Sequence, residues 1–537
     1  MDNLTGLDMI VAITQQTINS ELWNLFTTPL DPNDPNSDYV ISHTLETHPK
    51  VLPPNVPAPG PGITAVVGSM DEGLAPTVEL NFPTTNRHNL VFKVPLTSGT
   101  MNYFDILTGQ LATIRIDHWT IAFDVNMNIV EITAKSLPSS GASAAAQRYL
   151  QQFSDQEFTI NRLALDFENA NLANMDVKGS TVPGDPNSIA HITIIATLSG
   201  YFQGLKDSSN PYILGYPISS KNPQQTHPVL PAIEPTTTTF STTPYIVPPP
   251  RQHWAIPAGA AANTPGQDDL STLNFLMMTQ HKSFPTDPNT GLFNLNWVNS
   301  SDMQGVMVVA NRIFTSAYLE QLLIPTICAA LFSSLGLPSV EPTKTATGWN
   351  IQHEEKQNKV VVGSDSGIEN IYADFTARSN CDLQFLPGSK QMVGTGYFYR
   401  YAYYYETPFV QPSGIWVANL TVQLNWTLAI NLSAGDGLIV VTHSISQNGD
   451  ISEDFNENPV QKLGDLLGGN IASIKDAVGN QYKQLENIAF DRLTANLSAG
   501  LNHLQNRTVL PGGKVFFFKD LTFNAEQDML VTLTYKD

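Results

Sequence analysis

The sequence predicts an α+β fold in which a long helix packs into a strongly coiled antiparallel β-sheet. Three observations predict this fold. Residues 311–335 carry apolar side chains at helical spacing, and their second half is apolar on nearly every side. Residues 416–431 alternate apolar and polar side chains over an unusual length. Charged residues make up only 14% of the chain, so Asn, Gln, Ser and Thr must solubilise a large β surface.

A first helix-plus-sheet unit is expected at residues 1–205. Residues 7–26 place apolar side chains on one face and predict an opening helix. The clearest strand is 119–129, where Trp119, Ile121 and Phe123 alternate with polar residues. The remaining elements of this unit are expected strands at residues 78–82, 90–96, 158–167 and 191–202 and a helix at 139–152.

Residues 206–272 predict an irregular connection between two domains. Proline is frequent in this stretch, and Thr236 to Thr239 form a threonine run. Such a composition favours extended, irregular chain. Its aromatic residues, such as Tyr216 and Trp254, predict that it lies along a surface rather than free in solvent.

A second helix-plus-sheet unit is expected at residues 273–537. It begins with strands at 273–279 and 304–310, which lead into the 311–335 helix. Asn311 can cap the start of that helix, and Gly336 can end it. Pro325 lies inside the helix and should kink it. A helix that is apolar all round must be wrapped by other elements.

Long strands are expected to do the wrapping. Residues 393–405 place five tyrosines on one face, with Phe398, Arg400, Ala402 and Tyr404 on the other. Residues 416–431 predict a strand of roughly 50 Å, which must twist and coil. Residues 459–507 predict helices with breaks near Gly468 and Gly500, and closing strands are expected at 514–519 and 529–535.

The charge balance argues against nucleic acid and anionic membranes as partners. Lys and Arg number 27 and Asp and Glu number 48, which gives a net charge of −21. A chain this acidic is not expected to bind nucleic acid. The first residues lack a basic cluster and an unbroken apolar run, so no signal peptide is predicted. We therefore expect a soluble protein, either cytoplasmic or released without a cleavable signal.

No motif for catalysis, a metal or a cofactor is found in the sequence. The two cysteines, Cys328 and Cys381, make neither a disulfide framework nor a zinc site. Glu453 and Asp454 are interpreted as a solvated acidic turn. The tyrosine-rich strand at 393–405 is compatible with sugar stacking, but cross-strand aromatic pairing explains it equally well. We therefore expect a protein that is not an enzyme and has no cofactor.

Three segments resemble a known family. The segment at 311–336 with its LLIPTICAALF core, the C-terminal VLPGGKVFFFKDLTF at 509–523 with the closing VTLTYKD, and the opening LDMIVAITQQTINSEL are similar to P-forty-seven-type proteins. These proteins accompany OrfX-type proteins in clostridial neurotoxin gene clusters. The resemblance implies two tubular lipid-binding (TULIP-like) units and a role in a bacterial toxin complex with protein partners.

The leading hypothesis is a non-enzymatic protein that binds a lipid or another apolar ligand between helix and sheet. Leu322, Leu323, Ile327 and Leu331 are expected on one side of the ligand, and Trp416, Leu420, Leu424 and Trp426 on the other. For the helix residues, simple core packing is the competing interpretation. A second hypothesis is a pore-forming or insecticidal toxin that acts on its own, with the 459–507 helices contacting a membrane.

Overall fold

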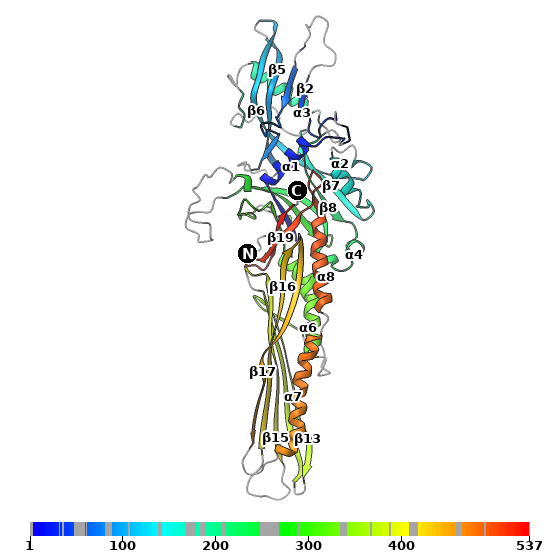
Figure 1. Cartoon of the computed structure of the whole chain (residues 1–537), viewed down its shortest axis with the longest axis vertical. Helices are drawn as coiled ribbons and strands as arrows, with labels where there is room; N and C mark the ends of the chain where they lie inside the picture. The colour runs from blue at the N-terminus through cyan, green and yellow to red at the C-terminus, as the bar shows by residue number, and fades with distance from the viewer. Residues whose placement is uncertain are drawn as a thin grey trace. The chain divides into compact units, whose positions relative to one another are not determined.

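The computed structural model confirms an α+β protein built mostly from strands in antiparallel sheets (Figure 1). It describes residues 4–31, 33–34, 37–47, 60, 62–80, 88–105, 108–137, 142–167, 179–182, 189–203, 205, 210–246, 268–287, 290–291, 293, 295–332, 341–365, 368–385, 388–406, 417–457, 464–487 and 490–535. The chain forms two compact units. Unit 1 comprises Met1–Ala310, Asn502–Asp520 and Leu530–Asp537, and unit 2 comprises Asn311–Leu501 and Leu521–Met529.

The first sheet is centred on a strand where the sequence predicted a helix. Its order is β19-β20-β11-β1-β10-β9. The strands are β1 (Met9–Thr14), β9 (Pro235–Thr243), β10 (Thr272–Thr279), β11 (Gly305–Val309), β19 (Phe517–Phe523) and β20 (Met529–Thr534). Every residue of β1 is buried, which suits its continuous apolar run. The predicted 7–26 helix is therefore wrong in its first half, and α1 (Gln15–Thr27) begins only after Thr14 caps it.

The second sheet of unit 1 has eight strands. The order is β18-β8-β7-β6-β5-β3-β2, and β4 also pairs with β5. The strands are β2 (Thr44–Glu46), β3 (Gly62–Val67), β4 (Thr77–Glu79), β5 (Asn89–Asp105), β6 (Gln110–Ile132), β7 (Phe158–Asp166), β8 (Ile213–Ser220) and β18 (Thr508–Val509). The predicted strands at 90–96, 119–129 and 158–167 are confirmed, although β5 and β6 are much longer than predicted.

Residues 191–202 form a helix, which corrects the predicted strand. The helix is α3 (Ile189–Gln203). Its run of β-branched residues imitates a strand, but Ile194, Leu198 and Phe202 recur every four residues and are all buried. Phe202 packs edge-on against Phe92 and Phe123 of the eight-stranded sheet. Tertiary packing therefore overrides the local propensity here.

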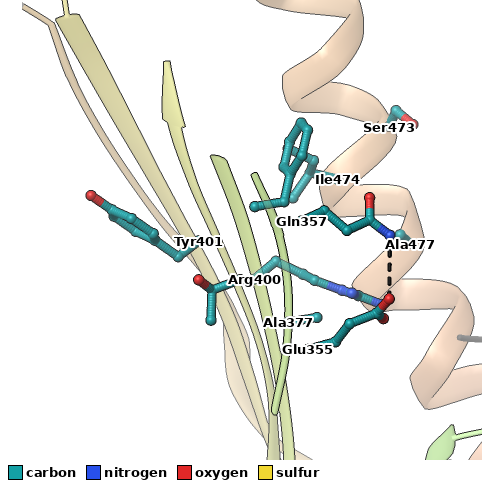
Figure 2. Close-up of a pocket in the computed structure, with 10 residues that line it drawn as sticks. Glu355, Gln357, Ala377, Arg400, Tyr401, Ser473, Ile474 and Ala477 are labelled. Atoms are coloured by element: carbon teal, nitrogen blue, oxygen red, sulfur yellow. Dashed lines mark hydrogen bonds between the residues drawn. The ribbon is translucent and has the colours of Figure 1, made fainter. Parts of the chain in front are cut away.

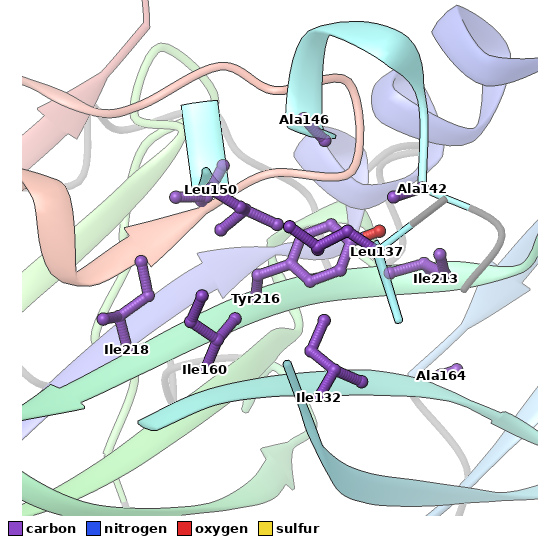
Figure 3. Close-up of a cluster of buried hydrophobic side chains, with 11 residues drawn as sticks. Ile132, Leu137, Ala142, Ala146, Leu150, Ile160, Ala164, Ile213, Tyr216 and Ile218 are labelled. Atoms are coloured by element: carbon purple, nitrogen blue, oxygen red, sulfur yellow. The ribbon is translucent and has the colours of Figure 1, made fainter. Parts of the chain in front are cut away.

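A compact apolar cluster fastens a short helix to the same sheet (Figure 3). The helix is α2 (Ala144–Leu150), which lies within the predicted helix at 139–152. Ser143 caps it by accepting a hydrogen bond from Ala146 N. Ala146 and Leu150 pack with Ile160 of β7 and with Tyr216 and Ile218 of β8. This burial holds the β7–β8 edge of the sheet.

The predicted irregular connection at 206–272 contains regular strands. β8 and β9 lie within it, and β10 begins at its end, so these strands belong to the sheets of unit 1. Residues 206–209 and 247–267, with Trp254, lie outside the described part of the chain. Between β8 and β9 lie α4 (Pro223–Thr226) and the 3-10 turn η3 (Pro231–Ile233). The threonine run lies in β9, where β-branched side chains suit a strand. The boundary between the compact units falls at Ala310 and Asn311 instead.

A buried charged cluster links η3 to the turn η7 (Leu504–Arg507) within unit 1. The Arg507 guanidinium donates to Glu234 Oε1 at 2.6 Å, and both side chains are almost fully buried. Arg507 also donates to His503 Nε2, and its guanidinium lies over the Phe158 ring. His503 packs edge-on against His227. Burial, with the Arg507 charge and His227 beside it, lowers the pKa of His503 to about 3.

Unit 2 begins with the predicted apolar helix. The chain is helical from Asn311 to Phe332, as α5 (Asn311–Phe314), a π-helical segment η5 (Thr315–Leu323) and α6 (Ile324–Phe332). Asn311 N donates to Asp528 Oδ1 at 2.9 Å, which places a carboxylate at the N-terminus. A kink was predicted at Pro325, and the helix changes there from π geometry, which ends at Leu323, to α geometry, which begins at Ile324. Pro325 has no N–H to donate back into the preceding turn.

Unit 2 carries a sheet of unusually long strands in the order β12-β13-β14-β15-β16-β17. They are β12 (Thr343–Lys344), β13 (Gly348–Asp365), β14 (Ile368–Phe385), β15 (Gln391–Glu406), β16 (Val417–Gly435) and β17 (Leu438–Glu457). The predicted strands at 393–405 and 416–431 are confirmed. β17 is the last strand of this sheet, and its register with β16 shifts between Gln423 and Asn425.

Two helices follow the sheet along the chain. They are α7 (Gly464–Glu486) and α8 (Phe490–His503). The predicted breaks near Gly468 and Gly500 are wrong, because both glycines lie inside continuous helices. α7 packs against β15, β16 and β17, and Figure 1 shows it running alongside these strands. Tertiary contacts therefore outweigh the helix-weakening effect of glycine.

The histidine in the buried cluster makes a testable prediction for pH. The pKa of His503 is lowered in the folded state. Below about pH 6.5 the unfolded state therefore binds a proton that the folded state does not bind. The stability cost grows as pH falls from 6.5 toward 3. His503→Gln keeps an acceptor for Arg507 but does not titrate. We expect the urea midpoint to fall less between pH 7.5 and pH 5 in the variant than in the wild type.

The control for this experiment is the same pair of midpoints at pH 7.5 and pH 9, where His503 is neutral in both states. The difference between variant and wild type should be constant there. Glu234, with a raised pKa, and His227, with a lowered pKa, stay in both proteins, so their contributions cancel in the comparison. An equal loss of stability in both proteins at pH 5 would contradict the assignment.

Candidate functional site

One face of the long sheet in unit 2 is buried, and we call it the inner face. It carries the even-numbered side chains of β15 and β16 and the odd-numbered ones of β14. Phe398, Ala402, Leu420 and Leu424 on this face are almost fully buried. Strict alternation places them together, because successive side chains of a strand point to opposite faces. Residues of α7 cover part of this face.

The structure buries several of the predicted ligand-contacting residues, but on two elements that do not face each other, and none of them lines the cavity described below. Leu420, Leu424 and Trp426 lie buried on the inner face, Leu323 and Ile327 are buried on the apolar helix, and Leu322 is half-buried. Trp416 and the side chain of Leu331 lie outside the described part of the chain. α6 packs against α7 and β14, whereas α7 packs against β15 and β16. The helix that contacts the strand of Leu420, Leu424 and Trp426 is thus α7.

The two cysteines belong to this interior. Cys328 of α6 is buried, and Cys381 lies on the inner face of β14 with no exposed surface. Burial raises the pKa of the Cys328 thiol to about 11 and raises that of Cys381 further, with Cys328 adding to the effect. Both thiols are therefore protonated near neutral pH and behave as small apolar side chains.

Trp426 fixes the spacing of the inner face. Its ring lies over Gly396, which is directly opposite it on β15. A Cβ atom added at Gly396 would come within 2.4 Å of the Trp426 ring and 2.2 Å of the Asn380 carbonyl oxygen. Phe398 packs beside the indole with ring centroids 6.0 Å apart. Gly396 is therefore required for close approach rather than for backbone freedom.

A cavity of about 260 Å³ lies between α7 and strands β13, β14 and β15 (Figure 2). Phe375, Ala377, Ile474 and Ala477 give it apolar walls. Its volume approaches the lower end of the roughly 300–1,000 Å³ typical of small-molecule sites. The small side chains of Ser473 and Ala477 on α7 leave this room above the sheet.

The cavity also contains charge. Glu355 of β13, Ala377 of β14 and Arg400 of β15 are directly opposite one another in register. Glu355 Oε1 accepts a hydrogen bond of 3.3 Å from Gln357 Nε2. Burial lowers the pKa of the Arg400 guanidinium, and the Glu355 carboxylate partly opposes that shift. Figure 2 shows Arg400 reaching from the sheet toward α7, while Tyr401 points to the other side.

Sequence reasoning did not select these residues. The only available signal was Arg400, a charged residue on the apolar side of the predicted 393–405 strand. Glu355 and Gln357 lie on a strand whose alternation is polar on both faces, so it was not predicted. Ser473 and Ala477 could not be selected from the sequence. A small side chain leaves a cavity only where no neighbouring residue fills the space, and the sequence does not show the neighbours.

Several buried polar atoms of this interior have no hydrogen-bond partner among the described residues. They are Trp426 Nε1, Tyr404 Oη, Ser379 Oγ and Gln481 Nε2. The first three lie on the inner face, and Gln481 lies on α7. Leaving such a group unpaired costs about 1–3 kcal/mol. An interior with several of them differs from a dry core and suits contact with water or with a polar part of a ligand.

The odd-numbered tyrosines of β15 lie on the opposite, outer face, whereas Tyr404 lies on the inner face. Tyr405 stacks with Tyr372 of β14 and with Tyr403, with ring centroids 5.8 Å apart in each pair. The Arg378 guanidinium lies over the Tyr399 ring. These contacts are the cross-strand and same-face pairs that stabilise a sheet. They account for the tyrosines without a sugar.

The described residues lack two kinds of feature. They contain no cluster of three or more His, Cys, Asp or Glu side chains arranged to hold a metal ion. They also contain no helix that combines the length and apolar character needed to cross a membrane.

Comparisons with known proteins were made for the whole chain. No family model matches it, and no curated protein matches it in sequence. Its structure is similar to P47 from Clostridium botulinum A2, with 10% identity over 99% of this chain and 98% of that chain and a TM-score of 0.49. P47 of Clostridium botulinum E1 gives 10% identity, 99% and 100% coverage and a TM-score of 0.46. The resemblance stated from the sequence is to these same proteins.

A third solved structure is that of a lipopolysaccharide binding protein. It shares 9% identity over 99% of each chain, with a TM-score of 0.25.

The close contact at Gly396 predicts a stability effect. In Gly396→Ala the new methyl group would overlap the Trp426 ring and the Asn380 carbonyl, so the strands must separate or the indole must move. We expect a loss of about 1–3 kcal/mol in the free energy of unfolding, as for other overpacked cores. Urea denaturation followed by tryptophan fluorescence measures it. Gly435→Ala, where the added methyl meets no atom within 4 Å, is the matched control. Equal stability of the two variants would contradict this packing.

Proposed function

We propose that unit 2 is a non-enzymatic binding module that holds an apolar or amphipathic small molecule between α7 and the inner face of the long sheet. The cavity beside Phe375, Ile474 and Ala477 is the observation that carries this proposal. It is a space with apolar walls next to a buried apolar sheet face, where transfer of a ligand's hydrocarbon from water is favourable.

The dimensions of the two partners support the proposal. Five strands, β13 to β17, span roughly 19 Å across the sheet at about 4.8 Å per neighbour. A helix with its side chains is only about 10–12 Å wide. α7 alone is therefore too narrow to cover this sheet, and α6 packs beside it on β14. The small residues Ser473 and Ala477 of α7 leave space next to β13, β14 and β15. A bound hydrocarbon would complete the cover.

The partnerless polar atoms add support. Trp426, Tyr404 and Gln481 present donors toward an interior that offers them no described acceptor. A ligand with a polar group, or water that enters with it, would supply acceptors. A purely structural core would gain stability by replacing these residues with apolar ones of similar shape.

We extend the proposal to two tubular lipid-binding units in one chain that serves in a bacterial toxin complex with protein partners. This extension rests on the segment resemblances at 311–336 and 509–523. Co-purification with individually tagged proteins of such a complex tests it. Failure to bind any of them would remove the extension and leave the binding module intact.

The alternative of a toxin that acts alone on membranes has less support. α7 carries Asp465, Lys475, Asp476, Lys483 and Glu486 within its length, and Lys475 is held by Glu453 of the sheet. We therefore expect no release of a trapped dye from liposomes at micromolar protein. Rapid release that is lost when α7 is tethered to the sheet by an engineered disulfide would favour the membrane alternative.

The first test of binding is native mass spectrometry of the purified chain, followed by organic extraction. We expect a small apolar molecule that co-purifies, or uptake of one equivalent of an offered one. A protein that stays unloaded with every offered compound would overturn the module.

A second test fills the cavity. Ala477→Trp places a large ring in the space, so we expect binding of the neutral fluorescent probe N-phenyl-1-naphthylamine to weaken at least ten-fold. Ala472→Trp adds the same side chain on an exposed position of the same helix and should leave binding unchanged. Equal effects of the two substitutions would place the probe elsewhere.

A further inference from the structure

Arg400 is a cation in apolar surroundings. It lies on the inner face of β15 between Phe398 and Ala402. Its direct neighbours across the sheet are Ala377 on β14 and Val422 on β16. Arg400 is half-buried, and the Glu355 carboxylate of β13 acts on it from the same face of the sheet. Removing a guanidinium from water costs free energy, which a bound anion offsets. An anionic group bound beside Arg400 would therefore be stabilised at this position.

The described residues give the Arg400 side chain no hydrogen bond and no ion pair, although other cations of this sheet region are paired. Arg378 Nε on the outer face lies 2.5 Å from Glu354 Oε2, and Lys475 Nζ of α7 lies 3.0 Å from Glu453 Oε2. The Glu355 carboxylate acts on Arg400 electrostatically, while its own hydrogen bond comes from Gln357. Arg400 thus keeps its donors available toward the cavity.

We infer that Arg400 binds the carboxylate head of a single-chain amphiphile, whose hydrocarbon lies against Phe375, Ile474 and Ala477. This inference rests on the proposed function and names its ligand class. A guanidinium presents parallel N–H donors that match the two oxygens of a carboxylate. The apolar walls beside it accept the alkyl chain.

The size and charge of the cavity narrow the ligand further. A volume of about 260 Å³ suits one alkyl chain better than two. Glu355 faces the same space as Arg400. Its negative charge opposes a second charge on the ligand head. A singly charged carboxylate therefore fits better than a phosphate that carries two charges.

The test compares three probes of equal chain length, dodecanoate, dodecanol and dodecyl phosphate, by isothermal titration calorimetry on the full chain at pH 7.5. We expect dodecanoate to bind at least ten-fold more tightly than dodecanol and more tightly than dodecyl phosphate. Arg400→Gln should reduce dodecanoate binding to the dodecanol level and leave dodecanol unchanged. Arg378→Gln removes the same charge from the outer face of the neighbouring strand and should change neither.

Glu355→Gln separates a binding role from a structural ion pair. If Glu355 repels a second negative charge, the variant should bind dodecanoate more tightly and dodecyl phosphate much more tightly, with dodecanol unchanged. If Arg400 and Glu355 serve only to stabilise each other, both variants lower the melting temperature and selectivity among the probes stays as in the wild type. Should Arg400→Gln fail to fold, Arg400→Lys keeps the charge but not the paired donors, and dodecanoate should lose affinity relative to dodecanol.

The outcomes distinguish the two levels of the proposal. Equal binding of dodecanoate and dodecanol by the wild type would overturn the role of Arg400 and keep the binding module. No binding of any probe would overturn the module itself. Tightest binding of dodecyl phosphate would overturn the preference for a single charge, and equal effects of Arg378→Gln and Arg400→Gln would overturn the assignment to the inner face.

Discussion

The register of the long sheet is the constraint on which unit 2 depends. Side chains alternate between faces with a period of two, so a slip of one residue would turn the whole apolar set to solvent. β14, β15 and β16 pair without a shift over their matched lengths. The Trp426 ring leaves no room for a side chain at position 396, so glycine must lie opposite it on β15. The burial of the inner face, the seat of α7 and the cavity all follow from this register.

The sequence allowed prediction wherever one physical signal dominated. The alternation in 416–431 identified both β16 and its buried face, and the helix began at Asn311 as predicted, although the carboxylate of Asp528 and not the Asn311 side chain accepts the first N–H. Short apolar runs were ambiguous, because MIVAIT in β1 suits a buried strand and a helix equally. α3 was misread because Ile and Thr favour strands locally, whereas its spacing of four residues matches a helix face.

The candidate site was less predictable than the fold. Leu420, Leu424 and Trp426 were predicted from periodicity, and they do lie on the inner face. The expected partner was the apolar helix, yet α7 packs on that strand, because spatial neighbours of a sheet face are not encoded in the spacing of either element. Arg400 and Glu355 lie on the same face because of the register of three strands. Two of these strands, β13 and β14, had no alternation strong enough for a strand to be predicted.

The outermost strand of the long sheet, β17, affects whether copies of the protein associate in concentrated solution. An exposed strand edge offers unpaired backbone groups to any second copy. β17 carries Asp450, Glu453, Asp454 and Glu457, and its register shift bends the ladder near the same residues. A second copy that paired edge to edge would align like charges along a strand that is no longer straight. The acidic second half of β17 therefore opposes edge-to-edge pairing of two copies, while Ile439 and Val441 in its first half belong to the core.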